Sequence, residues 1–362
     1  MADPREARQA ALRSQVGIEG LDLLLVQALP NIRYLTGFTG SAGLLLVRRD
    51  DVVLITDFRY AVQAPREVGD VARVEVDQVS VWDRLKRVLG ERASGVAGFE
   101  AHIATVRDRE RIEGLAPGLA WRPAPELVER LRAAKDAGEV ESIREAAALA
   151  QEALAETLPA VRPGETEFAI AARLEAALRR RGSEWHPFPT IVASGPRAAL
   201  PHARTSERTL GRGEWLLLDF GAQVDGYCAD LTRTVVVGAR ADERQRAVYD
   251  TVQRAQRRAL DHMRAAISGR VADALAREVI NQRGHGEAFG HSLGHGLGLE
   301  VHEAPRLSPT AEAALPAGAV VTVEPGIYLP GWGGVRLEDD VHLAPSGPEL
   351  LSDNRVDLLE LV

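Results

Sequence analysis

The sequence predicts an α/β protein built from two domains. Residues 20–124 alternate short apolar strands with helical stretches, which is typical of a domain with a mixed sheet. The next stretch, residues 125–161, is rich in Ala, Glu, Leu and Arg and favours long helices. After it, helical stretches alternate with strands and glycine-rich turns. We therefore expect an N-terminal mixed-sheet α/β domain over residues 1–124 and a second α/β domain over residues 125–362.

The first domain shows six short apolar or alternating segments that we predict as strands. They are residues 21–28, 43–49, 51–57, 72–77, 95–100 and 119–124. Helices are predicted over residues 81–93 and 104–116. The long helical stretch that follows has a predicted joint near Asp136-Ala137-Gly138, because Asp is a strong N-cap residue and Gly interrupts helices.

Composition and charge exclude several classes of protein. The chain has 362 residues, 45% hydrophobic, which is enough for a large core or two domains. Its net charge of −8 argues against nucleic acid as a partner. The single cysteine, Cys228, excludes an internal disulfide and suits a reducing compartment. The charged N-terminus has no apolar signal core, and the apolar runs are too short to span a bilayer. We expect a cytoplasmic protein without a membrane partner.

The stretch DFGAQVDGYCADLTRT, residues 219–234, predicts a β-hairpin. It follows the strand-like EWLLLD, contains the turn signal Asp225-Gly226 and ends in an alternating, β-branched stretch. Folding the hairpin brings Asp219 and Asp230 to roughly facing positions near the turn. Two like charges across a strand pair are destabilising, so this arrangement needs a compensating interaction.

Three of the nine histidines, His291, His295 and His302, fall within residues 290–306. This stretch lacks the H-E-x-x-H order of a helical zinc protease, and its glycines at 294, 296 and 298 disfavour a helix. We expect an irregular strand or loop that presents histidine side chains from a tight backbone. One such histidine would read as an ordinary, partly buried loop residue. Three in so short a stretch indicate a functional site.

Two more carboxylates are predicted on strands. Within residues 319–330 we predict a buried strand that ends at Glu324, directly before Pro325-Gly326. Residues 333–344 are predicted as one strand with Glu338 in its interior. A glutamate in such a strand is costly unless it is paired or bound to metal. Alternation places Glu338 on the same face as Arg336, so an ion pair with Arg336 is an alternative to a metal ligand.

Together, Asp219, Asp230, Glu324, Glu338 and one histidine supply four carboxylates and an imidazole. Such a set neutralises two divalent cations and removes the repulsion between the two aspartates. Oxygen-rich ligation with one imidazole favours Mn²⁺, with Co²⁺ and Zn²⁺ as alternatives. Two metals about 3.5 to 4 Å apart can share a hydroxide and make it a nucleophile near neutral pH. Aminopeptidases are among the enzymes known to use such two-metal sites.

These ordered motifs resemble the metallopeptidase family of aminopeptidase P and prolidase. The resemblance rests on DFGAQVDGYCADLTRT, HSLGHGLGLEVHE, TVEPGIY and GGVRLEDD, and on the upstream pieces IVASGPRAALPHA, NIRYLTGFTGSAG and TDFRYAVQA. It implies a creatinase/prolidase-like N-terminal domain, a pita-bread fold for residues 125–362, and a homodimer. One departure is Arg197, where the family more often has a small polar residue such as asparagine.

The resemblance also implies roles for individual residues. The implied metal ligands are Asp219, Asp230, His295, Glu324 and Glu338. Glu324 is in addition a catalytic residue that handles the proton of the attacking water. The other implied catalytic, substrate-contacting residues are His202, His291 and His302. Arg306 lies at the offset at which prolidases bind the substrate carboxylate, and we count Arg336 with it as a candidate substrate-binding residue.

The resemblance thus implies a Xaa-Pro dipeptidase that acts on Xaa-Pro dipeptides or short peptides. The main alternative is an aminopeptidase P, which must leave the end beyond proline open. Methionine aminopeptidases share the metal set but lack a counterpart of residues 1–124, and creatinases lose metal ligands that are all present here. A metal-free peptide-binding module of the same fold is a weaker alternative, because such a module has little reason to keep five ligands.

Overall fold

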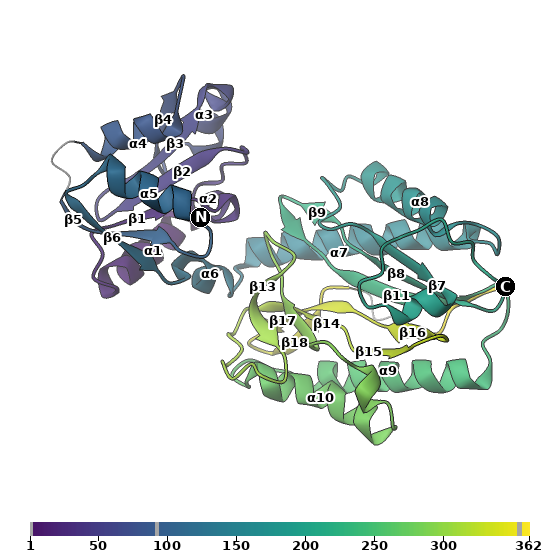
Figure 1. Ribbon diagram of the computed structural model, residues 1–362. Helices are drawn as coiled ribbons and strands as arrows, with labels where there is room; N and C mark the ends of the chain where they lie inside the picture. Colours follow the sequence, from purple (N-terminus) through teal and green to yellow (C-terminus); the bar gives the residue numbers. More distant parts are fainter. Residues whose placement is uncertain (1–2, 91–93, 353–356) are drawn as a thin grey trace. The chain divides into compact units, whose positions relative to one another are not determined.

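The computed structural model describes residues 3–90, 94–352 and 357–362. The chain divides into two compact units, Met1–Arg132 and Ala133–Val362 (Figure 1). The predicted division after residue 124 differs from this one by the short helix α6 (Leu127–Arg132). Among the described residues, no helix combines the length and the apolar character needed to cross a membrane.

The first unit is built on a six-stranded sheet with the order β4-β3-β2-β1-β5-β6. Its strands are β1 (Leu23–Val26), β2 (Gly43–Arg48), β3 (Val52–Asp57), β4 (Arg73–Asp77), β5 (Gly95–Glu100) and β6 (Leu119–Ala124). The pairs β1–β2 and β2–β3 are antiparallel, whereas β3–β4, β1–β5 and β5–β6 are parallel. All six predicted strands therefore form, and the sheet is mixed as predicted.

The helices of the first unit bury apolar residues against this sheet. They are α1 (Pro4–Ile18), α2 (Leu29–Thr36), α3 (Gln63–Val68), α4 (Val81–Leu89), α5 (Val106–Leu115) and α6, with a 3₁₀ turn at Phe58–Tyr60. Leu85 of α4 and Ile112 of α5 contribute to one core with alternate residues of the central strands. The prediction of a helix over 81–93 is confirmed up to Leu89, and its last residues, 91–93, lie outside the described residues.

The predicted joint in the long helical stretch is confirmed at Asp136. Helix α6 ends at Arg132, and α7 (Ala137–Thr157) begins directly after Asp136. The Asp136 carboxylate accepts hydrogen bonds from the backbone N–H groups of Gly138 and Glu139. Because a helix cannot satisfy its own first N–H groups, this cap stabilises a new helix start at the joint.

The second unit contains two larger sheets and two strand pairs. Its strands are β7 (Ile191–Ser194), β8 (Trp215–Phe220), β9 (Gln223–Val224), β10 (Tyr227–Cys228), β11 (Leu231–Val237), β12 (Gly294–Gly296), β13 (Glu303–Leu307), β14 (Val320–Val323), β15 (Gly326–Leu329), β16 (Gly333–Arg336), β17 (Asp339–Ala344), β18 (Gly347–Leu350) and β19 (Glu360–Leu361). One sheet has the order β19-β11-β8-β7 and the other β13-β12-β14-β17-β18. The pairs β9–β10 and β15–β16 stand beside them.

Two helix pairs enclose these strands. The helices are α7, α8 (Glu167–Arg180), α9 (Glu243–His262) and α10 (Gly269–Gln282), with 3₁₀ turns at Leu158–Ala160, Gly195–Ala199 and Gly286–Ala288. Figure 1 shows α7 and α8 on one side of the strands and α9 and α10 on the other. Leu216, Leu218 and Phe220 of β8 face the α7–α8 pair, whereas Trp215 and Leu217 belong to the core that also contains β14–β17. Asp219 shares the inward face with Trp215 and Leu217, because side chains alternate along a strand.

The prediction of one continuous strand over residues 333–344 is wrong. The chain forms β16, which pairs with β15, and then β17, which pairs with β14. Leu337 and Glu338 lie between the two strands, and Glu338 forms an isolated bridge with Thr232 of β11. The strand is broken because its two halves pair with partners in different sheets, and Glu338 is presented at this break.

Candidate metal centre and active site

The predicted hairpin is confirmed and places two aspartates on one face. β8 and β11 pair antiparallel, and the chain reverses between β9 and β10 through Asp225 (φ 48°) and Gly226 (φ 76°). Positive φ at both central residues is the requirement of a tight hairpin turn, which Asp-Gly meets. Thr232, not Asp230, lies directly opposite Asp219. Asp219 and Asp230 are therefore diagonal neighbours on one face, near enough for each carboxylate to raise the other's energy.

His295 is presented by the short strand β12 from a tight backbone, as predicted. A Cβ on Gly294 would lie 2.0 Å from the Thr322 carbonyl, and one on Gly296 would lie 2.2 Å from the Ala304 carbonyl. Only glycine fits on either side of His295. The His295 Nδ1 lies 3.0 Å from the Gly296 carbonyl and must donate to it, which leaves Nε2 with a free lone pair. Nε2 lies 3.5 Å from Glu324 Oε1 and 3.8 Å from Asp230 Oδ2.

The two glutamates meet the hairpin from different strands. Glu324 follows directly after β14, and its backbone N–H donates to the Leu293 carbonyl. The Thr232 hydroxyl donates to Glu338 Oε2 at 2.6 Å, which aims that carboxylate at the hairpin. One donor atom from each of Asp230, His295 and Glu338 lies within 4.8 Å of the others. The structure thus brings together carboxylates that lie more than a hundred residues apart in the chain.

The electrostatics of this cluster fit bound cations. Burial, with Glu338 as the next cause, raises the pKa of Asp230 and of Glu324 well above the usual range. Burial and the Asp219 carboxylate raise the pKa of Glu338 to about 8. Asp230 Oδ1 is buried without a hydrogen-bond partner among the described residues. A buried, unpaired carboxylate oxygen is costly, and a divalent cation is the partner that such an oxygen-rich set accommodates.

We expect the affinity for Mn²⁺ to rise as the pH is raised from about 6 to about 8, because the ligands must be deprotonated to bind metal. With a pKa of about 8, Glu338 holds a proton at neutral pH in the cluster without metal, and metal binding must displace it. The pKa values of Asp230 and Glu324 are raised in the same direction. Calorimetric titration in buffers of different ionisation enthalpy measures this proton release. Binding of Mn²⁺ without proton release at neutral pH would contradict a protonated Glu338 in the cluster without metal.

Arg336 takes a different place from the one that strand alternation suggests. It does not pair with Glu338. Its Nη2 donates to Asp219 Oδ2 at 2.5 Å, its Nη1 to the Tyr328 hydroxyl at 2.9 Å, and its Nε to the Thr232 hydroxyl at 3.0 Å. The residue is only 3% exposed. With its donors committed inside the protein, Arg336 orients Asp219, and its predicted substrate-binding role stays a prediction.

His291 has both ring nitrogens engaged. The Ser292 carbonyl can only accept, so His291 Nδ1 carries the ring proton and donates to that carbonyl at 2.8 Å. In the neutral ring Nε2 is then an acceptor, and the Tyr328 hydroxyl, which accepts from Arg336, donates to it at 2.8 Å. Burial lowers the pKa of His291 to about 4, so the ring is neutral at neutral pH. The ring is therefore held in one orientation and one tautomer.

His302 and His202 lie at the exposed side of the cluster. The His302 ring stands edge-on to the His295 ring, with centroids 4.3 Å apart. The pKa of His302 is lowered mainly by its partial burial and, to a smaller extent, by the charges of His202 and Arg306. Burial raises the pKa of Asp219, and the positive charges of Arg336, His202 and His302 oppose that rise. Both histidines thus act electrostatically on the cluster while remaining open to solvent.

The two remaining arginines differ in their environment. Arg306 lies on β13 opposite His295 of β12 and is exposed. Its guanidinium makes no hydrogen bond or ion pair with other residues in the described ranges. It is nevertheless close enough to help lower the pKa of His295, for which burial and then His302 are the larger causes. Arg197, by contrast, donates to the fully buried Glu167, which also accepts from Ser194. Arg197 is therefore tied to a structural cluster.

Sequence reasoning missed three residues of the site. Thr232 and Tyr328 connect Glu338, Arg336 and His291, as described above. Asp340 of β17 is fully buried and accepts the backbone N–H of Asp230 at 3.1 Å. The doubled aspartate after Glu338 and the tyrosine after Glu324 were visible signals. Neither could be assigned to the site without the register of the sheets.

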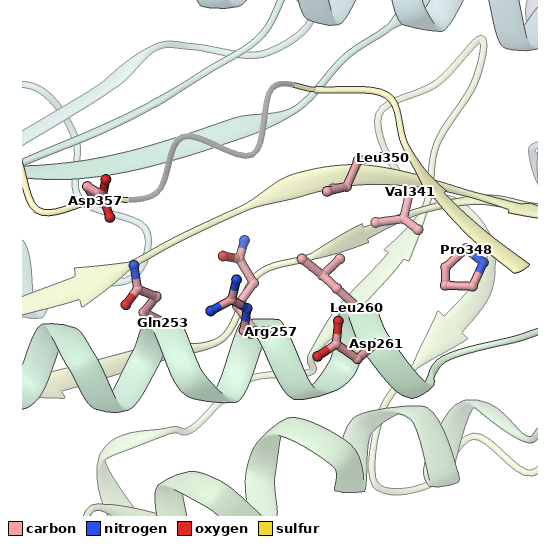
Figure 2. A pocket seen from close by; sticks show the side chains of 9 residues that line it. Gln253, Arg257, Leu260, Asp261, Val341, Pro348, Leu350 and Asp357 are labelled. Carbon is pink, nitrogen blue, oxygen red and sulfur yellow. The ribbon is translucent and has the colours of Figure 1, made fainter.

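A separate pocket of about 350 Å³ lies between α9 and the strands β17 and β18 (Figure 2). Gln256 and Val341 are among its lining residues. Gln256 donates to Asp339 Oδ2 at 2.8 Å, so Asp339 faces α9 while its neighbour Asp340 faces Asp230. Strand β17 therefore separates this pocket from the carboxylate cluster, and we assign the chemistry to the cluster.

Comparison with known proteins gives matches along nearly the whole chain. Residues 141–345 match the metallopeptidase family M24, and residues 8–134 match the creatinase/prolidase N-terminal domain. A Xaa-Pro dipeptidase of Pyrococcus horikoshii is 31% identical over 94% of this chain and 95% of its own length. The solved structure of a Xaa-Pro dipeptidase from Bacillus anthracis is 37% identical, with a TM-score of 0.95 over 99% of this chain and 100% of that one. An X-Pro aminopeptidase from Thermotoga maritima is 38% identical, with a TM-score of 0.90 over 97% of this chain and 99% of that one.

Proposed function

The chain belongs to metallopeptidase family M24 with a creatinase/prolidase N-terminal domain, and from this premise we propose that it is a Xaa-Pro dipeptidase. It is a peptidase with the pita-bread fold, an α/β architecture that its solved relatives share over nearly their full length. Its substrates are dipeptides with a C-terminal proline. An X-Pro bond is a tertiary amide without an N–H, so its cleavage cannot depend on recognising that donor.

We propose that the cluster holds two divalent metal ions, with Mn²⁺ as the preferred metal. The proposed ligands are Asp219, Asp230, His295, Glu324 and Glu338. The unpartnered, buried Asp230 Oδ1 and the free Nε2 of His295 support this set. When bound, such metals polarise the substrate carbonyl and lower the pKa of a water molecule. Arg336 holds Asp219 in place, and Thr232 holds Glu338.

The protein's own residues supply the remaining chemistry. Glu324 Oε1 lies 3.5 Å from His295 Nε2, and from this place in the cluster its carboxylate can take the proton of the attacking water and pass it on. The exposed ring of His302 offers an N–H donor for the developing oxyanion. His202, exposed on the same side, can guide the leaving nitrogen. The fixed ring of His291 is placed to contact the substrate.

Arg306 is the observation that favours a dipeptidase. Its guanidinium is exposed beside His302 and His295 and has no partner in the described part of the chain. A guanidinium binds a carboxylate through two parallel hydrogen bonds. A Xaa-Pro dipeptide offers that carboxylate directly after proline, whereas a longer peptide offers a neutral amide there. Arg306 therefore selects the free C-terminus.

Replacing Arg306 with alanine should lower kcat/KM for Ala-Pro roughly 10- to 150-fold. This corresponds to about 1.5 to 3 kcal/mol, the cost of a lost charge-assisted hydrogen bond. The same change should have little effect on Ala-Pro-amide, which lacks the carboxylate. Arg270→Ala is the matched control, because Arg270 is an exposed arginine of the same unit that pairs with Glu312. Faster cleavage of Xaa-Pro-Xaa tripeptides than of Xaa-Pro dipeptides by the wild type would instead identify an aminopeptidase P.

We also propose a homodimer and a cytoplasmic location. The family resemblance supports the first, and the single buried Cys228, which suits a reducing compartment, supports the second. Light scattering of the purified protein measures the oligomeric state directly.

A further inference from the structure

The segment that carries His291 has no regular structure of its own. Residues 289–293 connect the 3₁₀ turn at Gly286–Ala288 to β12 and belong to neither a helix nor a strand. Buried backbone N–H and C=O groups need hydrogen-bond partners, and an irregular segment cannot supply them from a ladder. Side chains from elsewhere must therefore satisfy this segment and fix its course.

Two residues of helix α10 supply these partners. Arg277 Nη1 donates to the Phe289 carbonyl at 2.8 Å, and Nη2 donates to the His291 carbonyl at 2.7 Å. Asp273, one turn earlier on the helix, accepts the Leu293 N–H at 3.0 Å. The two side chains also bond each other, with Arg277 Nε 2.6 Å from Asp273 Oδ2. The contacts thus lie before, at and after His291.

The same guanidinium also supports the ring of His291. It lies 4.2 Å from the centroid of the Phe289 ring, and Phe289 stands edge-on to the His291 ring at 5.0 Å. On its other side, His291 is held by the Tyr328 hydroxyl. Asp273 is only 1% exposed, so its carboxylate would be a costly group there if it were not paired and hydrogen-bonded.

We propose that Asp273 and Arg277 are positioning residues that fix the orientation and tautomer of His291 for substrate binding. This inference rests on the proposed function, in which His291 contacts the substrate. Arg277 does not touch the substrate and acts through the backbone carbonyls of Phe289 and His291. Because its planar fork bonds two carbonyls and a carboxylate at once, lysine cannot replace it.

A double-mutant cycle tests this proposal on the metal-loaded enzyme. Arg277→Lys should lower kcat/KM for Ala-Pro by about 100-fold, the scale of a small misplacement of a contacting group. In a His291→Ala background the same change should cost less than about 3-fold, because the group that Arg277 positions is already gone. Bound metal and the midpoint of thermal unfolding are measured on each variant, and Asp273→Asn should behave like Arg277→Lys. Glu278→Gln is the control: Glu278 lies on α10 next to Arg277 and pairs with Arg258 of α9, so this variant should match the wild type.

A second measurement reads the position of His291 without activity. In Zn²⁺-loaded protein with ¹⁵N-labelled histidine, His291 should show a single tautomer with the proton on Nδ1, and Arg277→Lys should shift or average that signal. The proposal would be overturned if the fold-losses in kcat/KM of Arg277→Lys and His291→Ala multiply in the double variant. An unchanged His291 signal in Arg277→Lys would overturn it as well. If the wild type does not cleave Ala-Pro, the proposed function fails instead, and the ¹⁵N signal still decides whether Arg277 positions His291.

Discussion

Replacing Asp230 with asparagine is expected to abolish hydrolysis of Ala-Pro and to lower the metal content of the protein. Asp230 is 5% exposed, lies within 4.8 Å of donor atoms of His295 and Glu338, and has a carboxylate oxygen without a protein partner in the described chain. Asparagine keeps the shape but removes the charge that the cation needs. Elemental analysis of the purified protein and an Ala-Pro assay measure both effects.

Asp225→Asn is the matched control for this change. Asp225 lies at the exposed turn of the same hairpin and has a positive φ, which asparagine tolerates. It removes the same charge from the same hairpin at a distance from the cluster, so metal content and activity should stay at wild-type levels. Full metal content and full activity in Asp230→Asn would exclude Asp230 as a ligand.

Replacing His302 with alanine should leave the metal bound and lower kcat by about 10²- to 10³-fold, or about 2.7 to 4 kcal/mol, which is the usual cost of one lost oxyanion donor. The reason lies in the different settings of two neighbouring histidines. His295 Nδ1 is tied to a carbonyl, so its Nε2 is directed at the carboxylates. The His302 ring is exposed at the side of His295 and can meet the substrate.

His262→Ala is the control, because His262 is an exposed histidine at the end of α9 and lies outside the site. If His302→Ala empties the metal centre while His295→Ala does not, the roles assigned to these two histidines must be exchanged.

Local patterns predicted the parts of this protein that depend on neighbouring residues. The hairpin at Asp225-Gly226, the helix start at Asp136 and the tight backbone around His295 are confirmed, because a turn, a cap and a close approach each depend on a few adjacent residues. The family resemblance added the candidate ligand set, whose members the structure brings into one cluster.

Long-range contacts could not be predicted in this way. Arg336 binds Asp219 across 117 residues of chain, and Asp340 accepts the N–H of Asp230 across 110. No spacing in the sequence encodes such a contact, which follows from the register of β8, β11, β16 and β17. For the same reason strand alternation offers Glu338 as an alternative partner of Arg336, whereas its buried partner is Asp219.

The break between β16 and β17 shows a similar limit. Residues 333–344 alternate like one strand, and only the change of pairing partner from β15 to β14 reveals two. The positioning role of Asp273 and Arg277 could not be predicted for another reason. An i, i+4 pair of opposite charges is common on helix surfaces, and only the contacts to residues 289–293 distinguish this pair from others.

The central claim is that a five-ligand cluster holding two divalent metals cleaves the bond before a C-terminal proline. Titrating metal-free protein with Mn²⁺ while following hydrolysis of Ala-Pro tests it most directly. The account predicts no hydrolysis without metal and a rise to a plateau at two equivalents of bound Mn²⁺ per chain. Full hydrolysis of Ala-Pro by protein shown to contain no metal would contradict it.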